Sequence, residues 1–427
     1  MLRLIRSIST SIRATSTLRT HPTTGFKLID PSVKVEEEGL EWYSPTRFYP
    51  VSLGQVLNSK YQVLVKLGFG SCSTAWLCRD LDARKYVAVK VCIADYPSVA
   101  RESAVYAHMR SVLDQNEQLP ATVRASVDEF DIAAEHAQHR CFVFEPLGVD
   151  LPLVKQILGS SFDETVFKRI AIHVLRSLDF LHSKAKVVHT DIRAENIHLA
   201  PVGDTCFRLT EQVELEAMPS DRKIDGSRVI YASSSIMFPT GDVRSLLGLP
   251  VLIDYGEARF GQDNYMDRIQ PYMYQAPEVI SDIPWSYPAD IWNVGVMLWD
   301  FFEGKRLLSA ANEHGDPSLY HLLAEMIALM GSPPESFLDA LDKGVRESVF
   351  GPNGNWTSPK GVSVPPLALE TAETALKAAG KDNTAFLNFM KRILVWDPTH
   401  RPTAAQLLED PWLEGVALPE NGIIEPN

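Results

Sequence analysis

The sequence predicts an α+β protein in which a β-rich segment precedes a longer helical segment. Strand-like apolar runs occur at Tyr61–Lys66 and Val87–Lys90, on either side of a glycine-containing stretch. Farther along, apolar residues recur at a spacing of about 3.6 residues from Glu164 to Ser183, which is typical of an amphipathic helix. The chain has 427 residues and is 45% apolar, which is sufficient for two or three cores of ordinary domain size.

The glycine-containing stretch is Leu67-Gly68-Phe69-Gly70-Ser71-Cys72-Ser73-Thr74-Ala75-Trp76. Gly68 and Gly70 have no Cβ, so the backbone can approach a phosphate group closely there, and Ser73 stands where a third glycine is usual. An ordinary hairpin turn is the alternative. Lys90 ends the second strand-like run and is a candidate phosphate ligand, the alternative being an exposed lysine at the end of a strand.

A second candidate functional segment is the stretch His189-Thr190-Asp191-Ile192-Arg193-Ala194-Glu195-Asn196. It sets Asp191 and Asn196 five residues apart, the spacing of a phosphoryl-transfer loop in which the carboxylate accepts a hydroxyl proton and the amide holds a metal ion. Such residues also gather in turns, where their side chains cap backbone groups. The apolar run ending at Ile253 leads into Asp254-Tyr255-Gly256, which offers a second metal ligand or, alternatively, a simple turn.

Three later motifs follow in a fixed order. They are Ala276-Pro277-Glu278, then Asp290-Ile291-Trp292-Asn293-Val294-Gly295, and then Asp397-Pro398-Thr399-His400-Arg401-Pro402. Each signal is weak alone, but all of them occur in order and at plausible distances, so together they are strong.

With these motifs, residues 55–415 resemble a eukaryotic protein kinase domain, and within that family the SR-protein-specific kinases. The phosphate loop and the catalytic loop are similar to that group's G-x-G-x-x-S-T-x-W and H-T-D-I-K-P-E-N patterns, and a hinge-like stretch follows its V-F-E-x-L-G pattern in Cys141-Phe142-Val143-Phe144-Glu145-Pro146-Leu147-Gly148. The resemblance implies a two-lobed fold. Its small β-rich lobe would span about 55–144 and its large helical lobe about 149–415.

The resemblance also implies roles for individual residues. Asp191 would be the catalytic base, Arg193 would neutralise the γ-phosphate in place of the usual lysine, and Lys90 would pair with Glu102. Asn196 and Asp254 would hold Mg²⁺. The ATP-binding set would be Gly68, Phe69, Gly70, Ser71, Ser73, Ala88, Lys90, Glu145, Leu147 and Leu199.

The segment from Asp254 to Glu278 contains no Ser and no Thr, and Thr190 stands where many kinases have an arginine that binds a phosphate on this segment. We therefore expect a segment ordered by packing and an enzyme that is active without phosphorylation of it. Neutral drift at Thr190 is the alternative.

Four regions lie outside the motifs. Residues 201–250 exceed what the connection to Asp254 needs and are predicted to be a surface insertion or disordered. Residues 1–29 carry five Lys or Arg and ten Ser or Thr before the first acidic residue, as in a mitochondrial transit peptide or a disordered basic tail. Residues 30–54 are predicted to be a linker and 416–427 a tail. A chain lacking residues 1–29 is expected to remain active.

Composition limits the partners. The net charge of −13 argues against a nucleic-acid binder that works by phosphate neutralisation, and permits basic or Arg/Ser-rich protein substrates carrying Ser or Thr targets. Five cysteines without metal-site spacing indicate an intracellular protein without structural zinc. No apolar run is long enough to span a membrane. We expect a monomer, in the mitochondrion if the first segment is a targeting signal and otherwise in the cytoplasm and nucleus.

Three function classes stay open at this stage. An active Ser/Thr kinase is favoured because Lys90, Asp191, Asn196 and Asp254 are all present. The alternative is a catalytically weak pseudokinase that acts as a nucleotide-binding scaffold. It would gain support if Arg193, Ser73 and the short spacing from Lys90 to Glu102 together abolished binding of ATP with magnesium. A small-molecule kinase of the choline or aminoglycoside type is disfavoured by the motifs around Glu278 and Arg401.

Overall fold

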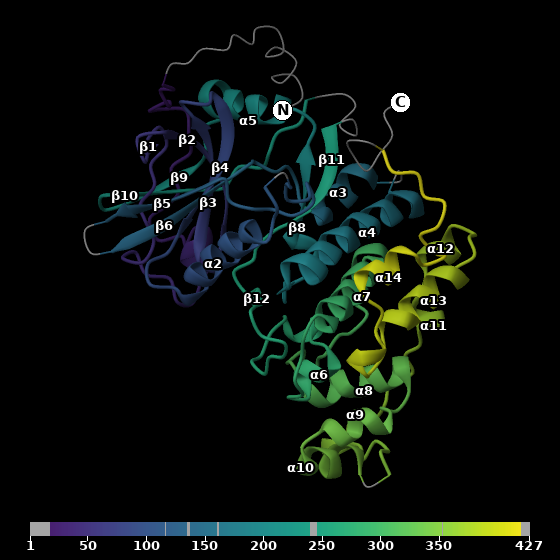
Figure 1. Cartoon of the computed structure of the whole chain (residues 1–427). Helices are drawn as coiled ribbons and strands as arrows, with labels where there is room; N and C mark the ends of the chain where they lie inside the picture. The colour runs from purple at the N-terminus through teal and green to yellow at the C-terminus, as the bar shows by residue number, and fades with distance from the viewer. Residues whose placement is uncertain are drawn as a thin grey trace.

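The computed structural model describes residues 18–115, 117–134, 137–159, 162–239, 246–351 and 353–419. It has a β-rich lobe and a larger helical lobe, the upper left and lower right halves of Figure 1. The predicted two-lobed α+β fold is therefore confirmed. Residues 1–17, which include most of the predicted targeting segment, and residues 420–427 of the predicted tail lie outside the described part of the chain.

The β-rich lobe is built on a six-stranded antiparallel sheet with the order β1-β2-β3-β4-β6-β5. Its strands are β1 (Val56–Leu57), β2 (Tyr61–Gly70), β3 (Ser73–Asp80), β4 (Lys85–Cys92), β5 (Asp128–Ala133) and β6 (Gln138–Phe144). Helix α2 (Pro97–Ser111) follows β4 closely. Gly70 pairs with Ser73, so the glycine-containing stretch is the end of a β2–β3 hairpin.

The helical lobe is organised around α3 (Leu151–Leu158), α4 (Glu164–Asp179) and α7 (Pro288–Glu303). The predicted helix begins at Glu164, where the Asp163 side chain accepts a hydrogen bond from Val166 N, and the chain continues to Ala185 as a π-helix. The remaining helices are α6 (Pro277–Ile280), α8 (Leu319–Met330), α9 (Glu335–Ala340), α10 (Lys343–Val345), α11 (Leu369–Ala372), α12 (Ala375–Ala378), α13 (Thr384–Ile393) and α14 (Ala404–Leu408). Among the described residues, no helix combines the length and apolar character needed to cross a membrane.

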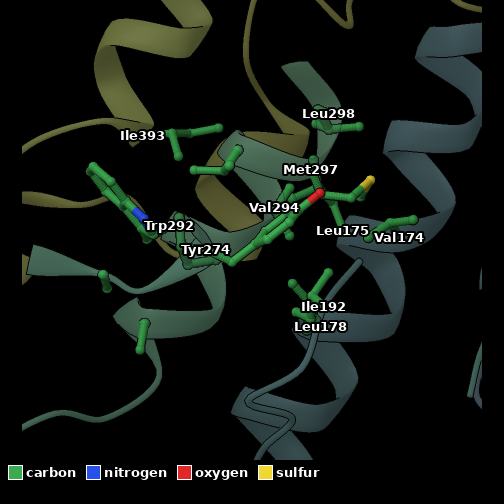
Figure 2. Close-up of a cluster of buried hydrophobic side chains, with 14 of the residues drawn as sticks. Val174, Leu175, Leu178, Ile192, Tyr274, Trp292, Val294, Met297, Leu298 and Ile393 are labelled. Carbon is green, nitrogen blue, oxygen red and sulfur yellow. The ribbon is translucent and has the colours of Figure 1, made fainter. Parts of the chain in front are cut away.

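Helix α7 is buried on nearly every side, as its apolar sequence predicts. A Cβ on Gly295 would lie only 2.5 Å from Ile393 Cγ2, so glycine lets α13 approach α7 closely. Figure 2 shows α7 side chains packed among residues of α4, together with Ile192 and Tyr274. The catalytic loop and the segment after Asp254 therefore rest on the same core.

Two small antiparallel sheets of two strands each position the loops at the junction of the lobes. Strand β8 (Ile197–Pro201) pairs with β11 (Leu247–Leu252), which brings the residues just before β8 and just after β11 together. Strand β7 (Val187–Val188) pairs with β12 (Arg259–Phe260), which holds the catalytic loop beside the later segment.

The described part of the predicted insertion, residues 201–250, is folded and packs on the β-rich lobe, so of the two expectations, a surface insertion or disorder, disorder does not hold for it. It forms α5 (Thr205–Gln212), a π-helix (Val213–Ala217), β9 (Arg222–Asp225) and β10 (Arg228–Tyr231). The buried side chains of Cys206 and Phe207 pack with Leu64, Leu77 and Tyr86 on the sheet, and α5 lies over the upper edge of the β-rich lobe in Figure 1. Its apolar residues cover a sheet face, so burial stabilises it.

Part of the predicted linker, residues 30–54, is also docked on this lobe. The folded domain therefore begins before residue 55, where the sequence analysis placed its start. Glu36–Gly39 forms a 3₁₀ helix. The buried Lys66 Nζ lies 2.9 Å from Glu36 Oε2 and 2.5 Å from Glu37 Oε2, while Lys223 pairs with Glu38 at 2.7 Å. These carboxylates compensate buried lysines, so residues 36–38 are part of the folded domain.

Candidate active site

A cavity of about 390 Å³ lies between the two lobes and is lined by residues from both. The residues predicted from sequence that line it are Gly68, Phe69, Gly70, Ser73, Ala88, Lys90, Glu102, Leu147 and Asp254. A larger depression of about 630 Å³ near Arg392 and His400 contains none of the predicted residues. The cavity between the lobes is therefore the candidate active site.

Three predicted nucleotide contacts do not line this cavity: Ser71, Glu145 and Leu199. The side chain of Glu145 is 59% exposed and pairs with Lys85. The prediction of Leu199 was wrong by one residue, because His198 lines the cavity instead. Successive side chains of a strand face opposite ways, so a shift of one residue changes the face. The Leu199 side chain is buried in the core, and its backbone bonds Gly148 and Val149.

Lys90 and Glu102 are paired, as the sequence predicts. Lys90 Nζ donates to both carboxylate oxygens of Glu102, at 2.8 and 3.0 Å, and lies 3.4 Å from Asp254 Oδ1. Tyr106 Oη donates to Glu102 Oε1 at 2.9 Å and fixes the carboxylate further. The short spacing between Lys90 and Glu102 suffices because α2 starts at Pro97.

The charges of this group support each other. Burial alone would lower the pKa of Lys90, but Asp254 and Glu102 outweigh it and hold the pKa well above its ordinary value. In return, Lys90 lowers the pKa of Asp254. Lys90 is thus a stable cation and Asp254 a stable carboxylate at neutral pH.

Asp191 is held by the residues around it. Asn196 Nδ2 donates to the Asp191 side chain at 2.8 Å and to its backbone oxygen at 2.9 Å. Asp191 N donates to His189 Nδ1 at 3.3 Å, and His189 Nε2 lies 3.0 Å from Ile253 O, an arrangement that requires the proton on Nε2. Burial raises the pKa of Asp191, opposed by the nearby Arg193 and His189. Asp191 and Asn196 do not line the cavity, but Ile253, which does, donates its N–H to Asn196 O at 2.9 Å.

Asp290 is a positioning residue that the sequence analysis recognised only as part of a helix-start motif. The fully buried carboxylate accepts from His189 N at 2.7 Å, from Thr190 N at 2.8 Å and from His182 Nε2 at 2.8 Å. A charged acceptor of backbone N–H groups fixes a loop strongly. The motif that contains Asp290 was recognised at the start of α7, but its spacing does not show which backbone N–H groups the carboxylate binds.

Arg193 lies beside the candidate base. Its Nε is 3.5 Å from Asp191 Oδ2, and Nε has no hydrogen-bond partner within the described chain. The Arg193 side chain is 41% exposed. It is therefore available to an anionic group brought next to Asp191.

The site fits a divalent cation bound together with phosphates. Asp254 has a left-handed backbone, with φ of 67°, and offers a carboxylate, while the amide oxygen of Asn196 takes no hydrogen bond from another described residue. Among the residues described, no cluster of three or more His, Cys, Asp or Glu side chains is arranged to hold a metal. Mg²⁺ commonly takes one or two protein oxygen ligands and completes its shell with water and substrate phosphates, so two ligands suffice.

The segment from Asp254 to Glu278 is ordered by contacts of its own. Arg101 Nη1 donates to Gly256 O at 3.0 Å and to Glu257 Oε2 at 2.7 Å. The Tyr265 ring stacks on Trp285 at 4.8 Å between centroids, and the two residues exchange backbone hydrogen bonds of 3.0 and 2.9 Å. These contacts need no phosphate.

The later motifs form a buried ion pair. Arg401 Nη1 donates to Glu278 Oε1 at 2.6 Å and Nη2 to Oε2 at 2.7 Å, with both side chains fully buried. The planar guanidinium matches the carboxylate in two-bond geometry. This pair anchors the end of the segment to the helical lobe.

Arg124 is a cavity residue that the sequence analysis missed. Its guanidinium carbon lies 4.2 Å from the centroid of the Phe144 ring, and its Nε has no partner within the described chain. Burial lowers the pKa of Arg124, opposed by Tyr106 and Glu102. Because it comes from the irregular stretch before β5, no motif signalled it.

Comparison with known proteins agrees with this geometry. The family model of the protein kinase domain matches residues 61–211 and 244–413. A serine/threonine protein kinase of Aspergillus fumigatus is 40% identical over 402 residues, which cover 94% of this chain and 96% of that protein. The matched segments flank residues 212–243, within the predicted insertion.

More distant relatives carry SR-protein kinase names. The serine/threonine-protein kinase SRPK of Physarum polycephalum is 25% identical over 395 residues, 89% of this chain and 92% of that protein. Human SRSF protein kinase 3 is 35% identical over 199 residues, 44% of this chain and 35% of that protein. A crystal structure of a kinase domain matches with a TM-score of 0.62 and 24% identity, covers 86% of this chain and 99% of that chain, and supports the fold.

Proposed function

Because the chain belongs to the protein kinase family, and to its serine/threonine class, we propose that it transfers the γ-phosphate of ATP, bound with Mg²⁺, to Ser and Thr hydroxyls of protein substrates. The observation that carries this proposal is the arrangement of five residues: Lys90, Glu102 and Asp254 line the cavity, and Asp191 and Asn196 adjoin it through Ile253. Lys90 is paired with Glu102 and reaches Asp254, and Asn196 holds Asp191 next to them. Positioning and charge neutralisation are the main needs of phosphoryl transfer.

In the proposed reaction, Asp191 orients the substrate hydroxyl and accepts its proton. Lys90 pairs with the α- and β-phosphates, and Arg193 faces the γ-phosphate. Asp254 and Asn196 would hold Mg²⁺, which when bound neutralises charge on the phosphates.

The proposed ATP contacts start with the β2–β3 hairpin over the phosphates: Gly68, Phe69, Gly70, Ser71 and Ser73. Ala88 and Leu147 line the cavity, and the backbones of Glu145 and Leu147 are proposed to bond the adenine. His198 replaces Leu199 as the floor of the site.

We also propose that the enzyme is active without phosphorylation of residues 254–278. The support is the set of contacts that order this segment, including Arg101 with Glu257 and Tyr265 with Trp285. Phosphatase treatment of the protein should leave its activity unchanged.

The substrate class is proposed to be basic proteins, with Arg/Ser-rich proteins as one member. A groove of about 500 Å³ beside the catalytic loop is lined by Glu195 and Asp300, which attract cations, but also by Lys155, Lys305 and Arg306. Because Arg306 already pairs with Asp300, the exposed Glu195 is the carboxylate available to a basic substrate. Names of relatives such as SRPK support the Arg/Ser-rich class only by analogy.

A nucleotide-binding scaffold is the second candidate. The observation that favours it is the closeness of Arg193 to Asp191, because a guanidinium that stays paired with the base would hinder proton transfer. The two candidates differ in phosphate transfer and agree in nucleotide binding.

The test is transfer from labelled ATP with magnesium to an Arg-Ser repeat peptide and to a generic basic Ser peptide, with Asp191→Ala as the matched inactive variant. Transfer that is lost in Asp191→Ala would support the kinase, and preference for the repeat peptide would support Arg/Ser-rich substrates. Binding of ATP without transfer to either peptide would favour the scaffold.

A further inference from the structure

The nucleotide cavity has a wall that comes from outside the family's motifs. Ser234, Ser235 and Ile236 line it together with Leu67 and Gly148, although they lie within the region predicted to be a surface insertion or disordered. We name residues 232–238 the wall segment.

The wall segment crosses from one lobe edge to the hinge. Ser234 N donates to Lys66 O at 2.8 Å, directly before the glycine-containing stretch. At the other end, Phe238 Cζ lies 4.0 Å from the position that a Cβ on Gly148 would occupy. The segment therefore runs past the part of the cavity that adjoins Leu67 and Gly148.

Hydrophobic packing and hydrogen bonds hold the segment in place. Ile236 and Phe238 pack on the cluster formed by α5 and the sheet, which includes Phe207 and Leu64. Met237 N donates to Thr210 Oγ1 at 2.8 Å. Its position is thus tied to the folded insertion.

A carboxylate from the N-terminal segment fixes the start of the wall. Glu36 accepts from Ser233 N at 2.5 Å and from Ser233 Oγ at 2.6 Å, and also lies 2.9 Å from Lys66 Nζ. Lys66 in turn donates to Tyr231 O at 2.8 Å. A fully buried lysine requires such partners. The positions of Glu36, Lys66 and the wall segment therefore depend on one another.

The wall is suited to a polar ligand. Ser235 is exposed and lines the cavity, and the Ser234 hydroxyl is shared with Ser220 at 3.0 Å. The wall segment adjoins Gly148, the residue after Leu147, whose backbone is proposed to bond the adenine, and the part of a nucleotide that follows the adenine is its ribose.

We propose that the wall segment completes the nucleotide site on its ribose side and excludes nucleotides with bulky ribose substituents, and that Glu36 is the positioning residue that holds it there. This inference rests on the proposed function, because it assumes that ATP occupies the cavity. It makes nucleotide selectivity depend on contacts between the N-terminal segment and the insertion.

The experiment measures equilibrium binding of ATP and of an ATP analogue carrying an N-methylanthraniloyl group on the ribose oxygens, with magnesium, to the full chain. The variants are Glu36→Ala and Ser233→Ala, and the matched control is Glu41→Ala, an exposed glutamate of the same segment. The wild type should bind ATP about tenfold more tightly or better than the analogue, because the wall segment leaves no room for the bulky group on the ribose. Glu36→Ala should reduce this preference by at least about threefold and raise KM for ATP with kcat nearly unchanged.

Ser233→Ala keeps Lys66 paired with both glutamates and should shift the preference in the same direction by less, which keeps the test valid if Glu36→Ala folds poorly. Glu41→Ala should match the wild type. An unchanged preference in Ser233→Ala and in folded Glu36→Ala would overturn the role of the wall while leaving ATP binding intact. Failure of the wild type to bind either nucleotide would overturn both this inference and the proposed function.

Discussion

Thr190 holds the start of the segment after Asp254 through a hydrogen bond of 2.7 Å from its Oγ1 to Glu257 O. Its backbone is left-handed, with φ of 72°, and its N–H donates to the buried Asp290. The side chain that replaces the usual arginine is therefore engaged with the backbone of the segment itself. Order at this point is built into the fold and needs no phosphate.

Replacing Thr190 by Val should weaken this order while preserving side-chain shape. Loss of one hydrogen bond costs about 1 kcal/mol, which lowers the ratio of ordered to disordered segment about fivefold. We expect the phosphorylation rate to fall by up to about that factor, with the affinity for ATP unchanged. Initial rates and ATP titrations check this expectation.

Thr190→Ser is the matched control, because it retains the hydroxyl. It should keep the wild-type rate. A Thr190→Val enzyme as fast as Thr190→Ser would show that the hydrogen bond has no role in ordering the segment.

The pH dependence should report the environment of Asp191. Burial raises the pKa of Asp191, and the base must be ionised to accept a proton, so the acidic limb of kcat/KM should lie above the ordinary range of an aspartate. Arg193 opposes the increase, so removing its charge raises the pKa further. In Arg193→Ala the acidic limb should therefore move to higher pH.

The measurement is a pH–rate profile of both enzymes with a peptide whose own groups do not titrate in that range. Arg346→Ala, which removes a half-buried arginine paired with Glu335 and Asp339 on α9, is the control and should leave the profile in place. A shift of the limb to lower pH in Arg193→Ala would contradict the proposed arrangement.

The buried pair of Arg401 and Glu278 should dominate the stability of the helical lobe. Arg401→Met leaves the Glu278 carboxylate buried without its cation, which typically costs about 3–5 kcal/mol. Adding Glu278→Leu should recover part of this loss, because a well-packed apolar pair avoids the desolvation cost.

Denaturant unfolding of the single and double variants tests this. Arg346→Met removes a half-buried arginine whose partners Glu335 and Asp339 are exposed, and it should cost much less stability. A double variant less stable than Arg401→Met would show that packing, and not the uncompensated charge, governs the site.

The arrangement of the proposed catalytic groups could be predicted because each group is encoded within a few residues. Asp191 and Asn196 lie in one loop, and the pairing of Lys90 with Glu102 needed only that α2 follow β4 closely. The error at Leu199 was one of register: a shift of one residue in a strand exchanges the buried and cavity-facing sides.

Contacts between distant segments could not be predicted in this way. The charges of residues 36–38 look like those of a solvated linker until their partners Lys66 and Lys223 are known. Likewise, Phe207 becomes a core residue only because α5 covers the sheet. A single sequence does not show which distant segments contact each other, whereas a motif places its functional residues close together in the chain.

Truncation separates the described N-terminal residues from those before them. A chain that lacks residues 1–17 is the reference for this comparison. Removing residues 1–29 eliminates the pair of Arg19 with Glu211 at 2.6 Å and the contact of His21 Nε2 with Leu64 O at 2.8 Å, so the β-rich lobe should unfold at a lower temperature. Because Glu36 and Glu37 remain, the longer truncation should still bind ATP and phosphorylate its substrate. Thermal unfolding with and without ATP, measured beside the phosphorylation rate, tests both statements. Equal unfolding temperatures for the two truncated chains would show that Arg19 and His21 contribute nothing to the lobe.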